Sequence, residues 1–266
     1  MTDPILYAQD DHVATLTFNR PDTRNALTDQ DMVDAAIAAC QKVAGDPTVR
    51  ALVVTGAGSA FSSGGNLKHM RDRVGTFAGT PAQVRDGYRN GIQRLALTLY
   101  NLEVPTIAAV NGPAYGAGCD TAMACDIRIA SDNAVFAENF VKVGLISGDG
   151  GSWLLPRAVG LSRACEMSFT GEPVNAETAL AWGMVSRVVS GERLLPEAQD
   201  LAARIAANPP GALRMAKRLI REGQTVRFDT LLEMAAAFQA ACHHTRDHEE
   251  AVGAFFEKRQ PVFAGE

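Results

Sequence analysis

The chain has 266 residues, of which 47% are hydrophobic and 21% charged, and its formal net charge at pH 7 is -5. This is the composition of a folded globular protein with one large core, or with a core and a small appended domain. The negative balance argues against a general nucleic-acid or membrane-surface role, although a local basic cluster could still bind phosphate.

The cysteines and the first residues of the chain indicate its compartment. The five cysteines are scattered and lack C-x-x-C spacing, so they predict neither a disulfide framework nor a zinc site. The N-terminus is acidic, and no uninterrupted apolar run reaches the roughly 18 residues that a membrane-spanning helix needs. We therefore predict a cytoplasmic protein with no membrane partner.

Four segments in the first half of the chain have the apolar, β-branched composition of buried strands. They cover residues 13–18, 51–55, 106–110 and 126–130. Segments with helical periodicity separate them, and this alternation predicts an α/β fold.

The first of the predicted helices has a start signal and a stop signal. Thr28 and Asp31 have the spacing of a capping box, and Gly45 with Pro47 ends the pattern. Between them, six apolar side chains recur along one face: Met32, Val33, Ala36, Ile37, Cys40 and Val43.

Two of the predicted strands run into stretches of small residues. The first stretch covers residues 56–68 (GAGSAFSSGGNLK), and the second covers residues 111–120 (NGPAYGAGCD). Small residues permit tight turns, and a following helix leaves its first backbone N–H groups without intrahelical partners. Two such turns could offer two donors to an oxyanion, as chemistry through a thioester enolate requires. The second stretch also ends in a carboxylate, Asp120, which could act as acid or base.

The remaining segments are predicted from their polarity and composition. Residues 71–84 are polar, contain glycine and proline and lack clear periodicity, so we interpret them as a mobile loop. Strand signals nearly vanish after Leu161, and alanine-rich amphipathic segments dominate from Glu192 onward. A mostly helical C-terminal part is therefore expected.

The two glycine-rich turns belong to a series of motifs that resembles the enoyl-CoA hydratase/isomerase (crotonase) superfamily. The series also includes residues 18–21 (FNRP), 24–27 (RNAL), 125–130 (CDIRIA), 143–145 (VGL), 155–157 (LPR), 170–172 (TGE) and 255–259 (FFEKR). No single motif is specific, but their order and number cover nearly the whole chain. The resemblance implies a crotonase-like spiral of ββα units with a C-terminal helical trimerisation region.

The resemblance also implies how the chain is divided and what it binds. Residues 1–200 would form the spiral core with the acyl-CoA site, and residues 201–266 a helical region for oligomerisation and CoA contact. The expected assembly is a homotrimer or a dimer of trimers. The substrate would be an acyl-CoA thioester of fatty acid metabolism, with coenzyme A as part of the substrate and no separate cofactor or metal.

Catalytic roles follow from the same resemblance. Ser63 and Ala117 occupy the places whose N–H groups form the oxyanion hole. Asp120 stands where the hydratases carry their first catalytic glutamate, although a carboxylate at a helix start can also serve the helix dipole alone. The place of the second glutamate holds Phe140. Water addition by two carboxylates therefore loses its expected partner.

Two other carboxylates could replace this glutamate. Glu138 lies two residues before Phe140, and the two side chains would share a face only if the segment is extended. Asp149 lies in the glycine-rich residues 148–151 and could equally be only an N-cap of the next helix. Burial near an acyl chain would raise the pKa of Asp149 and favour proton transfer.

The resemblance assigns five residues to CoA: Arg24, Ala60, Lys68, Phe255 and Lys258. The last two match the C-terminal segment that reaches CoA from a neighbouring subunit in that family. Otherwise a lone Lys or Arg is usually a solvated surface charge. Asp126, in contrast, is expected to anchor structure at the start of a strand.

Other functions are disfavoured by particular features. Residues 116–121 begin like a dinucleotide-binding G-x-G-x-x-G motif but end in Thr121, and no P-loop motif occurs. The histidine-rich and acidic residues 243–250 are interpreted as a solvated helix face rather than a metal site. A non-catalytic acyl-CoA-binding protein and a branch-specific acyl-CoA hydrolase or lyase remain alternatives. Because one base can run double-bond isomerisation through the enolate, the missing carboxylate favours isomerisation over hydration.

Overall fold

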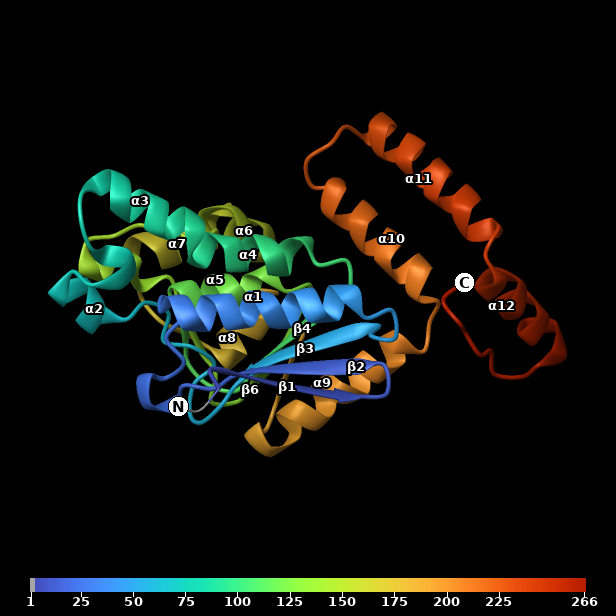
Figure 1. Cartoon of the computed structure of the whole chain (residues 1–266), viewed down its shortest axis with the longest axis horizontal. Helices are drawn as coiled ribbons and strands as arrows, with labels where there is room; N and C mark the ends of the chain where they lie inside the picture. Colours follow the sequence, from blue (N-terminus) through green and yellow to red (C-terminus); the bar gives the residue numbers. More distant parts are fainter. Residues whose placement is uncertain (1–2) are drawn as a thin grey trace.

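The structure is a computed structural model that describes residues 3–266 (Figure 1). Its largest sheet has six strands in the order β1-β2-β3-β4-β6-β9. Their bounds are β1 Ile5–Asp10, β2 Val13–Phe18, β3 Ala51–Gly56, β4 Thr106–Val110, β6 Ile127–Ser131 and β9 Arg187–Val189. The β1–β2 pair is antiparallel, and the other four pairs are parallel.

A second sheet holds three short strands in the order β5-β7-β8. Their bounds are β5 Ala114–Tyr115, β7 Val135–Ala137 and β8 Val174–Asn175. Ser62 forms an isolated parallel bridge with Ala114 of β5. This bridge joins the turn that follows β3 to the segment that follows β4, so the two stretches of small residues lie side by side.

Twelve α-helices lie within residues 3–266. Their bounds are α1 Gln30–Gly45, α2 Leu67–Asp72, α3 Pro81–Asn90, α4 Ile92–Asn101, α5 Ala117–Ala124, α6 Gly151–Val159, α7 Leu161–Thr170, α8 Ala176–Ala181, α9 Gly191–Ala206, α10 Pro210–Glu222, α11 Phe228–His243 and α12 Arg246–Glu257. Three 3-10 helices are η1 Pro21–Thr23, η2 Gly75–Phe77 and η3 Asn139–Val143.

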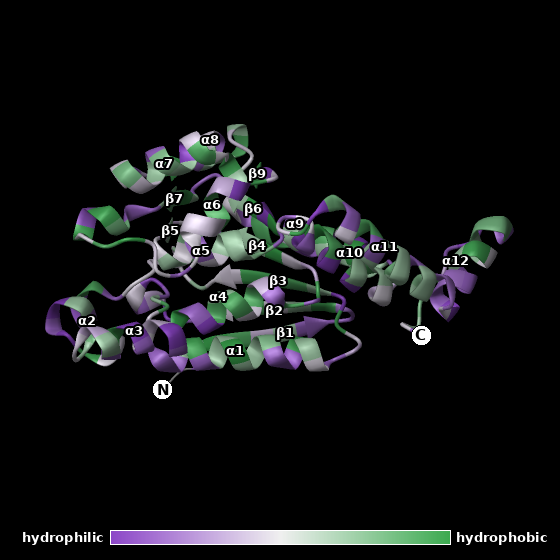
Figure 2. Ribbon diagram, turned by 90° about the horizontal axis from the view of Figure 1, so that it is seen from above, coloured by the Kyte–Doolittle hydropathy of each residue, from purple (hydrophilic) through white to green (hydrophobic). Residues whose placement is uncertain are grey.

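Side chains that alternate along the strands enter two cores on opposite faces of the sheet. Val54 faces the larger core, which it shares with buried residues of α1, α4 and α5. Its neighbour Val53 faces a smaller core, which includes Leu194, Ala198 and Ala202 of α9. Figure 1 shows α1 and α9 on the two sides of the sheet accordingly. In Figure 2 the central strand β3 is hydrophobic and much of the peripheral helix α3 is hydrophilic.

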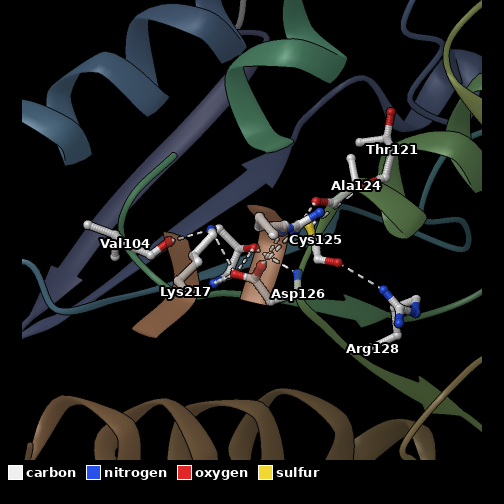
Figure 3. Close-up of polar contacts among 9 residues, drawn as sticks. Val104, Thr121, Ala124, Cys125, Asp126, Arg128 and Lys217 are labelled. Atoms are coloured by element: carbon white, nitrogen blue, oxygen red, sulfur yellow. Dashed lines mark hydrogen bonds and ion pairs between the residues drawn. The ribbon is translucent and has the colours of Figure 1, made fainter. Parts of the chain in front are cut away.

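An ion-pair network that includes the buried Lys217 joins α10 to the sheet. Lys217 Nζ lies 2.7 Å from the Asp126 carboxylate and donates to the Val104 carbonyl at 2.9 Å (Figure 3). Arg221 binds the other oxygen of Asp126 at 2.6 Å. Burial alone would raise the pKa of Asp126, but the two cations hold it below its usual value. The anchoring role expected for Asp126 is confirmed.

Helices α10 to α12 extend beyond the sheet, as both ribbon views show (Figures 1 and 2). None of the residues of α11 is buried, and its Phe228 is 74% exposed. The boundary predicted at residue 200 falls inside α9, which continues to Ala206 with Ala202 fully buried against the sheet. The C-terminal helices therefore separate from the core only after α9. Across residues 3–266, the helices lack the length and apolar character that crossing a membrane would require.

The four predicted strands are confirmed within one residue at each end as β2, β3, β4 and β6. The capping box predicted for α1 is wrong, since its N-cap is Asp29 and the Thr28 hydroxyl instead accepts from the Asn66 N–H at 3.0 Å. The predicted loop over residues 71–84 holds η2 and the start of α3, which has its own capping box from Thr80 and Gln83.

The interpretation of residues 243–250 as a solvated face agrees with the exposure of His243, His244 and Glu249, but it is wrong for Asp247. Asp247 is buried, and its carboxylate accepts hydrogen bonds from the N–H groups of Ala264 and Gly265 at 2.8 and 3.0 Å. This residue therefore fastens the C-terminal segment to α12.

Candidate active site

The turn after β3 packs directly on the start of α5. Tyr115 N–H donates to the Ser62 carbonyl at 3.0 Å. A Cβ on Gly64 would lie 2.3 Å from the Tyr115 carbonyl oxygen and 3.0 Å from the Ala117 nitrogen, and Gly64 has a φ of +77°. Only glycine meets both conditions, because a side chain would clash and the left-handed backbone would be strained. The two predicted turns thus form one site.

The backbone N–H groups of Gly65 and Ala117 at this junction have no acceptor within residues 3–266. Ala117 is the first residue of α5, so its N–H has no intrahelical partner, and the N–H of Gly65 in the neighbouring turn is also unpaired. Such donors can stabilise a negative oxygen.

The prediction for Ser63 needs a correction. Its N–H donates to the Arg24 carbonyl at 2.8 Å, and its hydroxyl donates to the Thr23 carbonyl at 2.9 Å. The backbone of Arg24 has a left-handed conformation, with a φ of 52°. This conformation turns the chain so that the Arg24 carbonyl can accept from the Ser63 N–H. The Ser63 N–H is therefore not available to a substrate, and Gly65 carries the free donor of this turn.

The structure brings the three predicted carboxylates together, although they come from three segments. Asp120 lies on the first turn of α5, Glu138 is the N-cap of η3, and Asp149 lies two residues before α6. All three are buried. A Cβ on Gly151 would lie 2.2 Å from Asp120 Oδ1 and 2.9 Å from Glu138 Oε2, so both carboxyl groups converge on the Cα of this glycine.

A serine that the sequence analysis did not single out completes this cluster. Ser147 Oγ donates to Asp120 Oδ2 at 2.8 Å and accepts from the Gly151 N–H at 2.9 Å. Its place shortly before Asp149 in a glycine-rich turn was visible in the sequence. Nothing in that spacing indicated that its hydroxyl reaches Asp120.

The buried environment raises the pKa values of all three carboxyl groups. Burial, followed by the charge of Asp120, raises the pKa of Glu138 well above its usual value. The same two causes raise the pKa of Asp149 to about 7. Burial also raises the pKa of Asp120, but hydrogen bonds from Glu138, Ser147 and the Gly151 N–H oppose that effect. Burial therefore favours the protonated form of Glu138, Asp149 is close to its midpoint at neutral pH, and Asp120 is the carboxyl group whose ionised form is supported by hydrogen bonds.

Each carboxyl group also retains an oxygen with no hydrogen-bond partner within the described residues. These buried atoms are Asp120 Oδ1, Glu138 Oε1 and Asp149 Oδ1. Buried polar atoms are normally paired, so unpaired ones indicate protonation or a ligand that is bound during function. The cluster is thus suited to accept and release protons.

Phe140 packs against the turn before α5, whereas Glu138 approaches Gly151 at the start of α6. A Cβ on Gly116 would be 3.3 Å from Phe140 Cζ, so the ring packs beside the residue that precedes α5. Because η3 starts directly after Glu138, the segment is not extended, and the two side chains do not share a face. Glu138 reaches Asp120 from the end of β7 instead.

The residues assigned to CoA do not lie close together within a single copy of the chain. Arg24 and Lys68 are exposed near the turn after β3, and the buried Ala60 accepts from the Asn25 side chain at 2.9 Å. Phe255 and Lys258 lie on or directly after α12, at the opposite end of the molecule from α2 (Figures 1 and 2). Their contact with CoA stays a prediction that requires a neighbouring subunit.

Comparison with known proteins gives a consistent result. The model of the enoyl-CoA hydratase/isomerase family matches residues 8–266. The chain is 39% identical over 255 residues to 1,2-epoxyphenylacetyl-CoA isomerase of Escherichia coli, covering 95% of each protein. It is 35% identical over 260 residues to crotonyl-CoA hydratase of Syntrophomonas wolfei, covering 97% of each. A crystal structure of enoyl-CoA hydratase from Bacillus anthracis matches with a TM-score of 0.93 and 32% identity, over 99% of this chain and 100% of that one.

Proposed function

The chain belongs to the enoyl-CoA hydratase/isomerase family, with the predicted crotonase-like α/β fold, and on this premise we propose that it moves the double bond of an enoyl-CoA. The observation that carries the proposal is the cluster of three buried carboxyl groups with raised pKa values beside the unpaired backbone N–H groups of Gly65 and Ala117. The substrate is an acyl-CoA thioester, whose acidity at Cα depends on stabilising an enolate.

The N–H groups of Gly65 and Ala117 are the proposed oxyanion hole. Negative charge develops on the thioester oxygen when Cα loses a proton, and fixed backbone donors stabilise that charge without reorganising. The N-terminus of α5 adds the positive end of the helix dipole at the same place. Both donors lie on tightly packed turns, so their positions are set before the substrate binds.

Asp120 and Asp149 are the proposed base and acid. The C–H bond at Cα breaks as Asp120 takes the proton, and the electron pair moves into the dienolate. Asp149 then gives its proton to Cγ, and the electrons return from the oxyanion to form the double bond between Cα and Cβ. A pKa of about 7 suits this second step, because general acids work best near the ambient pH. Glu138 keeps its proton and supports the charge on Asp120.

Hydration is the second candidate function. It needs one carboxylate to activate water and another to deliver a proton, and the position of the second hydratase glutamate is taken by Phe140. Asp149 or Glu138 would have to replace that group, and their approach to Asp120 supports this possibility. A relative named crotonyl-CoA hydratase also favours it.

The test is turnover of a short-chain 3-enoyl-CoA and of crotonyl-CoA, with both products measured by mass spectrometry. We expect bond migration to exceed hydration, and we expect Asp120→Asn to lower migration by about 10²- to 10⁴-fold, the range of general acid–base catalysis. Asp132→Asn is the matched control, because Asp132 is exposed. Hydration as the main product would favour the second candidate, and full activity of Asp120→Asn would exclude Asp120 as the base.

A further inference from the structure

Ser147 is the point at which an exposed loop reaches the buried carboxyl groups. It follows η3 and precedes α6, and the two side chains before it are exposed, Leu145 by 38% and Ile146 by 79%. Ser147 itself is half-buried. Its hydroxyl therefore turns inward from a segment whose apolar side chains point outward.

Two hydrogen bonds fix the direction in which this hydroxyl donates. The backbone N–H of Gly151 can only donate, so it occupies a lone pair of Ser147 Oγ at 2.9 Å. The hydroxyl proton is directed to Asp120 Oδ2 at 2.8 Å. A hydrogen bond to an ionised oxygen is about twice as strong as one to a neutral oxygen, so this arrangement favours the charged carboxylate.

We propose that Ser147 is a positioning residue that holds Asp120 as an oriented, ionised base. The inference rests on the proposed role of Asp120 in proton transfer. It adds a residue from the loop before α6: the serine binds Asp120 Oδ2, whereas Glu138 Oε2 and Asp120 Oδ1 converge on Gly151.

Several other titratable groups face Asp120, and their states define what Ser147 must do. Burial raises the pKa of Glu138, at the end of β7, well above its usual value, and its Oε2 approaches the same glycine, Gly151, as Asp120 Oδ1. The buried Cys119 thiol on α5 has a pKa raised well above its usual value by burial and then by the nearby carboxylates, so it stays neutral. Asp149 from the loop before α6 gains charge above a pH of about 7 and then disfavours the charge on Asp120. Ser147 opposes that effect with a donor that does not titrate.

The test is a direct titration of Asp120 by NMR in protein labelled with [4-¹³C]aspartate. The Asp120 signal is identified by its loss in Asp120→Asn. We expect Ser147→Ala to move the Asp120 midpoint upward by about one pH unit, since a hydrogen bond to a charged group and one pKa unit have similar free energies. Ser147→Thr keeps a hydroxyl and is expected to restore the midpoint, and Ser152→Ala on the exposed face of α6 serves as control.

Ser147→Cys provides a second variant in case the unpaired Gly151 N–H destabilises Ser147→Ala. A thiol is a weaker donor of similar shape, so a smaller upward shift of the midpoint is expected. An unchanged Asp120 midpoint in whichever of these two variants folds would overturn the proposal. The titration needs no turnover, so a wild-type protein that acts on neither substrate would refute the proposed function alone. With an active protein, the acidic limb of the kcat/KM profile should shift upward with the NMR midpoint.

Discussion

Gly151 is predicted to be essential for activity because two carboxyl groups converge on it. A Cβ at this position would lie 2.2 Å from Asp120 Oδ1, whereas ordinary contact begins at 3.4 Å, so Gly151→Ala must displace the carboxylate by about 1.2 Å. A misplacement of about 1 Å in a catalytic geometry lowers the rate by about 10²-fold. We therefore expect the turnover of Gly151→Ala to fall by about 100-fold or more.

The same substitution should leave the protein folded. Gly151 begins α6 and has no left-handed φ, so alanine suits the backbone, and overpacking of this kind typically costs about 1–3 kcal/mol. Gly191→Ala is the matched control: Gly191 begins α9, and no atom lies within 4 Å of its would-be Cβ. Turnover of the 3-enoyl-CoA and urea unfolding are measured for both variants. A folded Gly151→Ala protein within about threefold of wild-type activity would refute this reasoning.

Three further predictions concern charge and specificity. Folding raises the pKa of Asp149 from 3.8 to about 7, so the free energy of unfolding should fall as pH rises between these values. Asp149→Asn should therefore be more stable than wild type by up to about 4 kcal/mol at pH 8 but not at pH 4. Urea unfolding at the two pH values measures this difference. Asp126→Ala leaves the buried Lys217 uncompensated and should destabilise the fold by about 3–5 kcal/mol, whereas a loss below about 1 kcal/mol would show that the network is not a structural anchor. Phe140→Glu places a carboxylate beside the turn before α5 and should raise the ratio of hydration to bond migration, and an unchanged ratio in a folded variant would contradict that role for position 140.

Four of the six strands of the main sheet were predictable because their signals are local. β2, β3, β4 and β6 are short, apolar and followed by turn residues, and each is buried on at least one face. β1 gives no such signal, since its side chains are mostly exposed and it is stabilised by pairing with β2 at the sheet edge. The continuation of α9 beyond residue 200 also depends on its packing against the sheet. The local sequence of α9 does not show that packing.

Only those residues of the candidate site that lie in the recognised motifs could be predicted from the sequence. The resemblance placed Asp120 and Ala117 at the start of one helix, and the structure agrees on that location. It could not show that Arg24 would occupy the Ser63 N–H, because that contact joins segments about 40 residues apart. The contacts of Ser147 and Glu138 with Asp120 likewise depend on how three separate segments pack, so they required coordinates.

The acid and base of the proposed reaction are distinguished by the environment of each carboxyl group rather than by residue type. Asp120 receives hydrogen bonds that oppose the effect of burial, whereas burial and the charge of Asp120 both raise the pKa of Asp149. The resemblance places Phe140 at the position of the second hydratase glutamate, so the proposed reaction takes its proton from Asp149 instead. This difference is the physical reason to expect bond migration rather than hydration.

The most direct test is a single turnover of a 3-enoyl-CoA in deuterated water, with the position of the label determined by mass spectrometry. The account predicts a 2-enoyl-CoA product that carries one solvent deuteron at Cγ, and much slower labelling in Asp149→Asn. A hydrated product would contradict bond migration, and migration with full label at Cγ in Asp149→Asn at the wild-type rate would contradict the assignment of Asp149 as acid.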